Sequence, residues 1–335
     1  MATTLIALGA NLGDRQGNLQ RALTLLERPP ELRVIACSRW FGTAPIGGPA
    51  GQAEFVNAAA RLETTLAPLH LLNVLRQVEA ELGRQRRQRW AARCVDLDLL
   101  LFDDLVLKTP ELEVPHPRMA FRRFVLEPAA DVAAELRHPL IGWTIGQLLR
   151  HLNTAANYVA LTGVPGAGKT RVARDVVAAT ASCLVADPVE PWPDSTPREL
   201  LAGERLAGER LAGERRRWLQ RAELLAGQDW TADAPAVISD FWLDQSWAYR
   251  QRWPEETLRA EFASSWPADS SLPPLVQPKL LVLLEPPHVP SRWERLAADL
   301  RRRVFQPGCG PRLVLDAARP EAASVELCAA VAAMR

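Results

Sequence analysis

The chain has 335 residues, 48% of them hydrophobic and 24% charged, and its formal net charge is +1. This length suffices for two domains of ordinary size, and the composition excludes a largely disordered chain. Because the net charge is close to zero, the totals also exclude a global field that would attract nucleic acid or a membrane surface, so any attraction for phosphate must be local.

The five cysteines are scattered and show no CxxC spacing. The first residues read as a strand and a turn, without a basic region in front of an apolar run, and no apolar run is long enough to span a bilayer. We therefore expect a cytoplasmic protein with reduced thiols and without a disulfide framework, a zinc site or contact with a membrane.

Strand and helix patterns alternate through the first half of the chain. Hydrophobic spacing predicts helices over residues 14–27, 68–82 and 145–152, and strands over residues 4–8, 33–43, 54–64, 94–102 and 124–126. With antiparallel pairing, these elements predict a compact α+β domain of the ferredoxin-like type. The glycine- and proline-rich loop at residues 43–51 is typical of a functional lid.

Two chemical signals meet in residues 83–98. Five arginines, Arg84, Arg86, Arg87, Arg89 and Arg93, precede Asp96 and Asp98. Residues two apart in a strand point to the same face, and two carboxylates held together favour a cation such as Mg²⁺ between them. Guanidinium groups pair with phosphate oxygens, so the stretch predicts phosphoryl-type transfer. An arginine run is also typical of a solvated surface or a nucleic-acid-binding patch. A DxD pair at a strand edge is also typical of ordinary polar surface residues.

Several spaced motifs over residues 3–150 carry a resemblance: LGANLGDR, the loop Thr43–Gly47, FVNAA, the arginine run, VDLDLLLF and VPHPRM with RRFVLEP. Together they resemble 6-hydroxymethyl-7,8-dihydropterin pyrophosphokinase of folate biosynthesis. The resemblance implies transfer of pyrophosphate from ATP to the hydroxymethyl group of the pterin, with release of AMP and with two Mg²⁺ ions.

The resemblance also implies residue roles. Asp96 and Asp98 would hold the Mg²⁺ ions, and Arg84 and Arg93 would be catalytic. The implied nucleotide contacts are Glu79, Arg89, Trp90, His116 and Arg122. The implied pterin pocket consists of Thr43, Ile46, Phe55, Asn57 and Phe124, in which two rings offer flat faces and an amide offers a donor and an acceptor. Without the family, the phenylalanines read as core, and His116 reads equally well as a structural turn residue.

The chain departs from the family at three places, one of which is an arginine loop that is about one residue shorter than in the family. Ala91-Ala92 stands where the family has Gly-Pro before the second catalytic arginine, and Ala44 interrupts the usual Thr-Pro-Pro. These departures bear on loop closure, but the proposed metal ligands and catalytic arginines are all present. We therefore expect an active domain.

A second pattern starts near residue 153. A predicted strand at 158–162 runs into GVPGAGKT and then into a predicted helix at 171–179, which is the setting in which a P-loop is meaningful. The backbone around Gly163, Gly166 and Gly168 would cradle phosphates, Lys169 would reach the β- and γ-oxygens, and Thr170 would bind one Mg²⁺. The alternative is a relic loop that no longer binds nucleotide.

Further strands are expected at residues 183–186, 236–239, 279–284 and 312–315, which predicts a parallel α/β sheet. Asp187 and Asp240 follow two of these strands, where ligands bind. This half faintly resembles deoxynucleoside kinases, which implies that Asp187 is a general base near a sugar hydroxyl. The arginine that the family has after the next core strand is absent, since Phe241 follows Asp240. Arg301–Arg303 read as a solvated helix face or, alternatively, a lid.

Three tandem LAGER copies at residues 201–215 predict an exposed helical insertion rather than a solenoid. Eight of the 11 tryptophans follow residue 150, and we expect most of them to pack in the core.

In outline, residues 1–152 form a dihydropterin pyrophosphokinase domain and residues 153–335 a P-loop domain that phosphorylates a nucleoside-like molecule. In the alternative interpretation the second domain only binds nucleotide or mediates a homodimer. Nucleic-acid binding by residues 84–93 is disfavoured.

Overall fold

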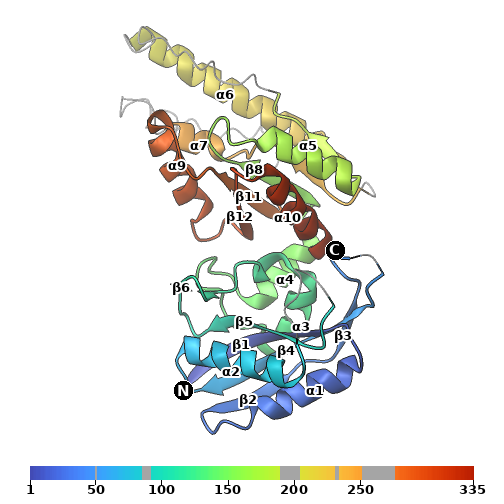
Figure 1. Ribbon diagram of the computed structural model, residues 1–335. Helices are drawn as coiled ribbons and strands as arrows, with labels where there is room; N and C mark the ends of the chain where they lie inside the picture. Colours follow the sequence, from blue (N-terminus) through green and yellow to red (C-terminus); the bar gives the residue numbers. More distant parts are fainter. Residues whose placement is uncertain (50, 85–91, 189–203, 231–233, 251–275) are drawn as a thin grey trace. The chain divides into compact units, whose positions relative to one another are not determined.

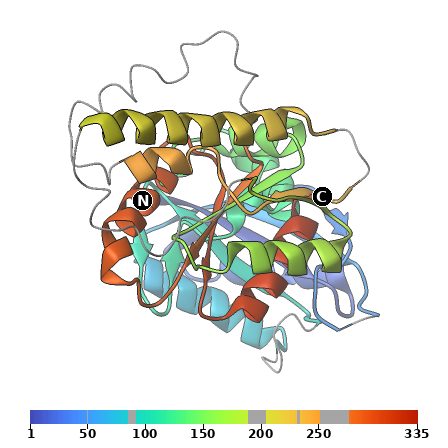
Figure 2. The same cartoon turned by 90° about the horizontal axis from the view of Figure 1, so that it is seen from above.

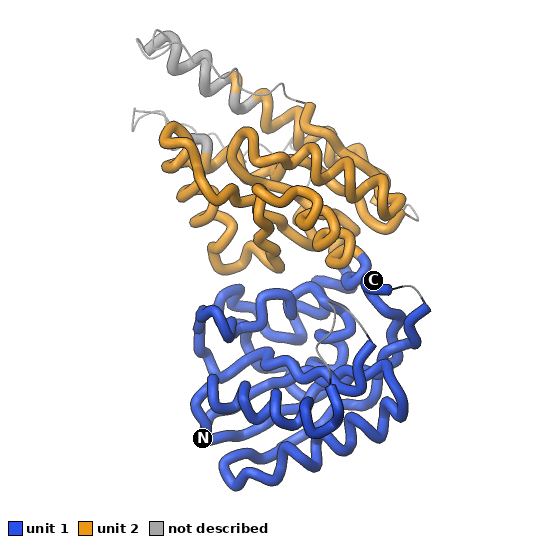
Figure 3. Tube along the Cα trace, viewed as in Figure 1, with its two compact units in different colours: residues 1–154, 332–335 blue, residues 155–331 orange. Residues whose placement is uncertain are grey.

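The computed structural model (Figure 1 and, from above, Figure 2) describes residues 1–49, 51–84, 92–188, 204–230, 234–250 and 276–335. The chain divides into two compact units (Figure 3). Residues 1–154 form the first unit together with residues 332–335, and residues 155–331 form the second.

An antiparallel sheet organises the first unit. Its strands are β1 (Ala2–Ala10), β2 (Leu32–Cys37), β3 (Phe41–Thr43), β4 (Phe55–Thr64) and β5 (Asp96–Phe102). The order is β2-β4-β1-β5, and β3 also pairs with β4. The single strand expected at residues 33–43 is therefore two strands. Ser38 interrupts them, because its hydroxyl donates to the Arg39 carbonyl and accepts from the Ala59 N–H.

Helices cover both faces of this sheet. Helices α1 (Arg15–Leu26) and α2 (Pro68–Glu81) bury leucines against the even-numbered residues of β4, among them Val56 and Leu62. Helix α3 (Arg123–Ala133) packs on β4 from the side of its odd-numbered residues, where Arg61 pairs with Glu135 at 2.7 Å. Helix α4 (Ile145–Thr154) packs on α3.

The expectation of a strand at residues 124–126 is wrong, since these residues begin α3. Val125, Leu126, Ala129 and Ala133 are all buried at helical spacing, so the packing of a longer amphipathic segment outweighs the strand propensity of a short apolar run. A small hairpin of β6 (Leu107–Lys108) and β7 (Glu113–Val114) and the short helix η1 (Met119–Phe121) lie between β5 and α3.

A parallel sheet organises the second unit, as expected. Its strands, in the order β12-β11-β8-β10-β9, are β8 (Tyr158–Thr162), β9 (Cys183–Val185), β10 (Val237–Ser239), β11 (Leu280–Glu285) and β12 (Arg312–Asp316). In Figure 2, helices α6 (Glu204–Ala226) and α7 (Gln245–Arg250) lie on one side of these strands. Helices α5 (Lys169–Thr180) and α10 (Pro320–Ala333) lie on the other, and α9 (Ser291–Val304) packs on β11.

Helix α6 begins inside the LAGER segment, so the helical prediction is confirmed from residue 204 onward, and residues 201–203 lie outside the described part. Its second half buries Trp218, Ala222 and Leu225 in the core of the second unit. Trp242 and Trp293 are buried as well, in line with the expected packing role. Within the described residues, no helix is both long and apolar enough to cross a membrane.

Candidate functional site

Three strands of the first unit bring the predicted metal ligands and pterin-pocket residues onto one surface. In the sheet register, Gly9 of β1 lies between Asn57 of β4 and Asp96 of β5. In the next row on the same face, Ala7 lies between Ala59 and Asp98. Two small residues thus form a floor between the amide and the two carboxylates, on the face of the sheet opposite α1 and α2.

Asp96 holds two arginines. Its Oδ1 lies 2.6 Å from Arg84 and its Oδ2 2.5 Å from Arg93. Burial and then repulsion from Asp98 raise the pKa of Asp96, while Arg93 and Arg84 oppose the rise. A divalent cation would relieve the same repulsion, so the donor set suits Mg²⁺, which prefers carboxylate oxygens.

Glu79 binds one of these two arginines, Arg84. It is 3% exposed, and its Oε1 accepts from the Leu97 N–H at 2.8 Å and also binds Arg84. In this structure Glu79 therefore anchors Arg84 to β5 from inside the unit. The sequence resemblance implied a nucleotide contact for Glu79, and that role stays a prediction.

His116 lies beside the carboxyl-terminal half of β5, where its backbone N–H donates to the Leu100 carbonyl at 2.9 Å. Its Nδ1 accepts from the Arg118 N–H at 3.2 Å. Partial burial, reinforced by the positive charges of Arg122 and Arg118, lowers the pKa of His116 to about 3. The imidazole is therefore neutral at physiological pH, with its proton on Nε2.

The predicted pterin residues come from four places in the chain. Asn57 is buried and donates to the Thr43 hydroxyl at 2.7 Å. Phe55 and Phe124 are both half-buried, and guanidinium groups lie over both rings, Arg93 at 6.0 Å from Phe55 and Arg122 at 5.6 Å from Phe124. Ile46 is half-buried in the loop between β3 and β4. The side chains of Arg89 and Trp90 lie outside the described residues.

Asn11 is a site residue that the sequence reading missed. It is 2% exposed, and its Oδ1 accepts from the Arg93 N–H at 2.8 Å while its Nδ2 donates to Gln52 at 3.1 Å. One side chain thus ties the end of β1 both to the arginine segment and to the glycine-rich loop. The signal was available, since Asn11 follows directly on a strand within LGANLGDR.

The predicted P-loop of the second unit runs from β8 into α5. Lys169 donates to the Gly163 and Val164 carbonyls at 3.1 and 3.2 Å, so it closes its own loop. Burial lowers the pKa of Lys169 to about 8, although Asp240 and Asp187 act in the opposite direction. Gly166 and Gly168 have φ values of 81° and 79°, which glycine adopts without strain.

A polar chain continues from the P-loop. The Thr170 hydroxyl donates to Asp240 Oδ2 at 2.5 Å, and Asp240 Oδ1 accepts from the Asp187 N–H at 2.7 Å. Both side-chain oxygens of Asp187 accept from Arg221 of α6, at 3.0 and 2.6 Å. The predicted general base is therefore engaged by a guanidinium that the sequence did not suggest.

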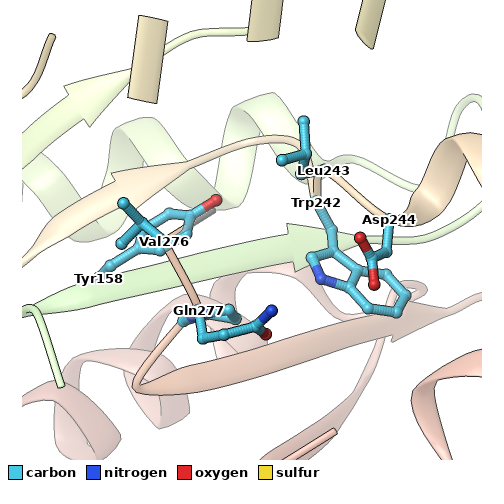
Figure 4. Close-up of a pocket in the computed structure, with 7 residues that line it drawn as sticks. Tyr158, Trp242, Leu243, Asp244, Val276 and Gln277 are labelled. Carbon is cyan, nitrogen blue, oxygen red and sulfur yellow. The ribbon is translucent and has the colours of Figure 1, made fainter. Parts of the chain in front are cut away.

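The described residues of the second unit enclose a small cavity and line a larger one. One, of about 10 Å³, is lined by Tyr158, Trp242 and Asp244 among others (Figure 4) and has room for a single water molecule only. The other, of about 220 Å³, lies beside Gly163 and Val164 and has mainly apolar walls, including Leu284 and Leu300.

The arginines expected to form a solvated face or a lid all have acidic partners. Arg301 pairs with Glu285, Arg302 with Asp299 and Arg303 with Asp244. In the described residues no group of three or more His, Cys, Asp or Glu side chains converges as in a protein-only metal site. Mg²⁺ is commonly held by one or two carboxylates together with phosphate oxygens and water, which suits the pair Asp96 and Asp98.

Comparison with known proteins separates the two halves. A family model described as 7,8-dihydro-6-hydroxymethylpterin-pyrophosphokinase (HPPK) matches residues 5–134. The 2-amino-4-hydroxy-6-hydroxymethyldihydropteridine pyrophosphokinase of Pseudomonas aeruginosa is 44% identical over 162 residues, which cover 48% of this chain and 96% of the relative. The Bacillus subtilis protein of the same name is 44% identical over 131 residues, 39% of this chain and 78% of the relative.

Likeness to solved structures is weaker. Deoxyadenosine kinase from M. mycoides with bound dATP covers 51% of this chain and 96% of its own, with 16% identity and a TM-score of 0.38. Plasmodium falciparum HPPK-DHPS with pteroate covers 97% of both chains, with 10% identity and a TM-score of 0.36.

Proposed function

Because the chain belongs to the HPPK family, we propose that its first unit transfers pyrophosphate from ATP to 6-hydroxymethyl-7,8-dihydropterin and releases AMP. The observation that carries the proposal is the row Asn57–Gly9–Asp96 with Asp98 in the next row. Asn57, Asp96 and Asp98 all point to the same face of the sheet. This arrangement supports binding of a flat heterocycle by the Asn57 amide, next to the two carboxylates.

Each charged residue has a role in this proposal. Asp96 and Asp98 would hold Mg²⁺, which supplies charge neutralisation to the triphosphate. Arg84 and Arg93 would leave Asp96 for phosphate oxygens, where guanidinium groups pair bidentately. Neutral His116 and Arg122 would contact ATP. Transfer of this kind depends on positioning and charge more than on covalent chemistry.

The pterin side of the proposal depends on Asn57, whose amide would read the edge of the ring. Phe55 and Phe124 would stack on its faces, and Thr43 would hold the amide in place. Ile46 would close the loop side of the pocket. Arg89 and Trp90 stay candidates for the nucleotide side on the strength of the sequence resemblance alone.

The test is AMP release from ATP in the presence of Mg²⁺ and the pterin. Asp98→Asn should reduce the rate about 100-fold or more, because the metal contributes several kcal/mol to charge stabilisation. Asp104→Asn, at an exposed position just beyond the same strand, is the matched control and should keep the wild-type rate. Absence of AMP from the wild type, or full activity of Asp98→Asn, would contradict the proposal.

We also propose that the first unit has the ferredoxin-like fold and that the second is a P-loop kinase-like domain that binds ATP. Support for the first comes from the element order β1-α1-β2-β3-β4-α2-β5, in which the short strand β3 pairs only with β4 and lies off the main strand order β2-β4-β1-β5. Support for the second comes from the P-loop between β8 and α5 and from the contact of Thr170 with Asp240. In P-loop enzymes a hydroxyl and an aspartate of this kind hold Mg²⁺. Asp240 was not among the residues predicted to bind the metal.

Lys169→Ala tests the second site. We expect one ATP-binding event to disappear in equilibrium binding, while AMP release with the pterin stays within about twofold, because each unit has its own buried core. Arg174→Ala, elsewhere on α5, is the control. If wild-type protein binds no ATP beyond the pterin-dependent site, the P-loop proposal falls.

A further inference from the structure

Arg221 is a buried cation in the second unit with every nitrogen engaged. It is 7% exposed. Its Nε and Nη2 donate to the two oxygens of Asp187 at 3.0 and 2.6 Å, and its Nη1 donates to the Ser246 hydroxyl at 3.3 Å. The Phe241 ring lies 5.7 Å from the guanidinium carbon. The guanidinium is therefore held away from water in a fixed orientation.

This pair lies beside the P-loop. The Asp240 carboxylate accepts hydrogen bonds from both the Asp187 N–H and the Thr170 hydroxyl. Asp187 is therefore linked through one carboxylate to Thr170, which is proposed to bind Mg²⁺. Asp187 and Asp240 follow the adjacent parallel strands β9 and β10. Ligands of α/β sheets bind at these carboxyl ends. Arg221 therefore lies where the second substrate of a phosphoryl transfer would bind.

The pairing of Asp187 with Arg221 favours a phosphate over a hydroxyl as the acceptor of the phosphoryl group. A hydroxyl acceptor needs a base for its proton, yet both oxygens of the available carboxylate accept hydrogen bonds from Arg221. A phosphate oxygen is already ionised at neutral pH and needs no base. A buried guanidinium is also costly to leave unpaired, so it gives up Asp187 only for another anion. Phosphate matches the guanidinium fork.

We propose that the second unit transfers the terminal phosphoryl group of ATP to a nucleoside monophosphate whose phosphate binds Arg221. This inference rests on the proposed ATP binding by the P-loop. An oxygen of the acceptor phosphate forms a bond to the γ-phosphorus of ATP. The bond from that phosphorus to the β–γ bridging oxygen breaks, and its electron pair leaves with ADP. No proton is transferred, and the products are ADP and a nucleoside diphosphate.

The proposed reaction of the first unit supplies such an acceptor. Pyrophosphate transfer from ATP releases AMP, which is a nucleoside monophosphate. The second site would consume it with another ATP and yield two molecules of ADP. AMP is therefore the first acceptor to test.

The experiment uses the full chain with Mg²⁺ and ATP but without the pterin, and measures ADP. AMP, CMP, UMP, GMP and dTMP are each compared with the corresponding nucleoside. We expect at least one monophosphate to be phosphorylated with a kcat/KM about tenfold or more above that of its nucleoside, and Lys169→Ala to abolish the ADP. Preference for a nucleoside, or ATP binding without turnover of any monophosphate, overturns this inference alone. Absence of ATP binding at the P-loop overturns the proposed function as well.

Arg221→Lys tests the residue itself, because lysine keeps the charge and loses the fork. We expect the KM for the monophosphate to rise about 10- to 100-fold, with the KM for ATP unchanged. The unchanged ATP affinity shows that the second unit is folded. Arg216→Lys, at an exposed position of the same helix, should leave both values unchanged. An unaltered KM for the monophosphate in Arg221→Lys means that the pair with Asp187 only stabilises the fold, and the inference fails.

Discussion

A single glycine separates the amide of Asn57 from the carboxylate of Asp96 in the sheet of the first unit. A Cβ at Gly9 would lie 3.1 Å from Asn57 Oδ1 and 3.9 Å from the Phe55 ring. The first distance is tighter than ordinary van der Waals contact, so the amide would have to shift. The backbone here requires no unusual φ, and glycine is needed for space alone.

Gly9→Ala should therefore raise the KM for the pterin about 5- to 10-fold, since crowding of a packed site costs about 1 kcal/mol or more. The KM for ATP should change little. Gly42→Ala is the matched control, because a Cβ at Gly42 meets nothing within 4 Å. Steady-state kinetics with each substrate varied in turn decides the point, and an equal effect on both KM values would contradict a role specific to the pterin side.

His116 makes the stability of the first unit depend on pH. Its pKa falls from an ordinary 6.5 in the unfolded chain to about 3 in the folded one. The unfolded state therefore binds the proton more tightly, and the stability from neutral His116 is present above pH 6.5 and is lost as the pH falls toward 3. Arg122 and Arg118 reinforce this direction, while Asp96 and Glu113 oppose it.

Between pH 7 and pH 5, we expect His116 to account for about 1 kcal/mol of lost stability, roughly half of what the full shift would give, because the side chain is partly exposed to water. His116→Gln should remove this part of the loss. The loss of stability is measured from the urea midpoints of unfolding at the two pH values. Pulse proteolysis quantifies how much of the first unit is still folded at each urea concentration. His70→Gln, on the exposed side of α2, controls for the loss of a histidine. Equal pH dependence of wild type and His116→Gln would refute the assignment.

Among the elements, the end of β1 positions two loops at once through Asn11. Its side chain holds the Arg93 N–H and also donates to Gln52 and to the Ala53 carbonyl. The arginine segment and the glycine-rich loop therefore share one anchor, although they are far apart in the sequence.

Asn11→Ala should lower kcat about 10-fold, because Arg93 loses its backbone anchor, and should lower the free energy of unfolding by about 1–2 kcal/mol. Asn18→Ala removes a buried amide of the same kind that bonds the Leu12 carbonyl and Arg21 in α1 instead. This control should lose stability and keep its kcat. If the two variants lose kcat equally, Asn11 acts through stability alone.

The elements also show what sequence patterns determine. Period-3.6 spacing predicted α2 well because this helix buries one clear stripe, whereas β8 was predicted as a continuous apolar run and is buried along its whole length. Residues 124–126 were misread because three apolar residues fit either period, and only the burial of Ala129 and Ala133 on the sheet decides for a helix. The second site shows a different limit. The P-loop motif is local in sequence and can therefore be predicted from it, whereas Arg221 is 34 residues from Asp187. No pattern in either segment predicts that these two side chains pair.

At the scale of the whole molecule, the two units have separate hydrophobic cores. Leu19, Leu71 and Leu99 belong to one cluster of buried residues, and Tyr158, Trp218 and Leu283 to another. The compact units divide between residues 154 and 155, close to the boundary expected after residue 152, but the last four residues group with the first unit. The domain assignment as functional units stays a prediction.

A fragment of residues 1–154 tests that assignment. Because its sheet and both helical layers lie within these residues, we expect it to unfold cooperatively and to release AMP with a kcat within about threefold of the full chain. Loss of residues 332–335 should cost some stability, since Ala333 and Met334 are buried. The control is the full chain carrying Lys169→Ala, which lacks the proposed second activity but keeps every residue of the first unit. An inactive fragment beside an active Lys169→Ala chain would show that the first unit needs residues beyond 154 for its fold, and residues 1–154 would then not be an independent functional unit.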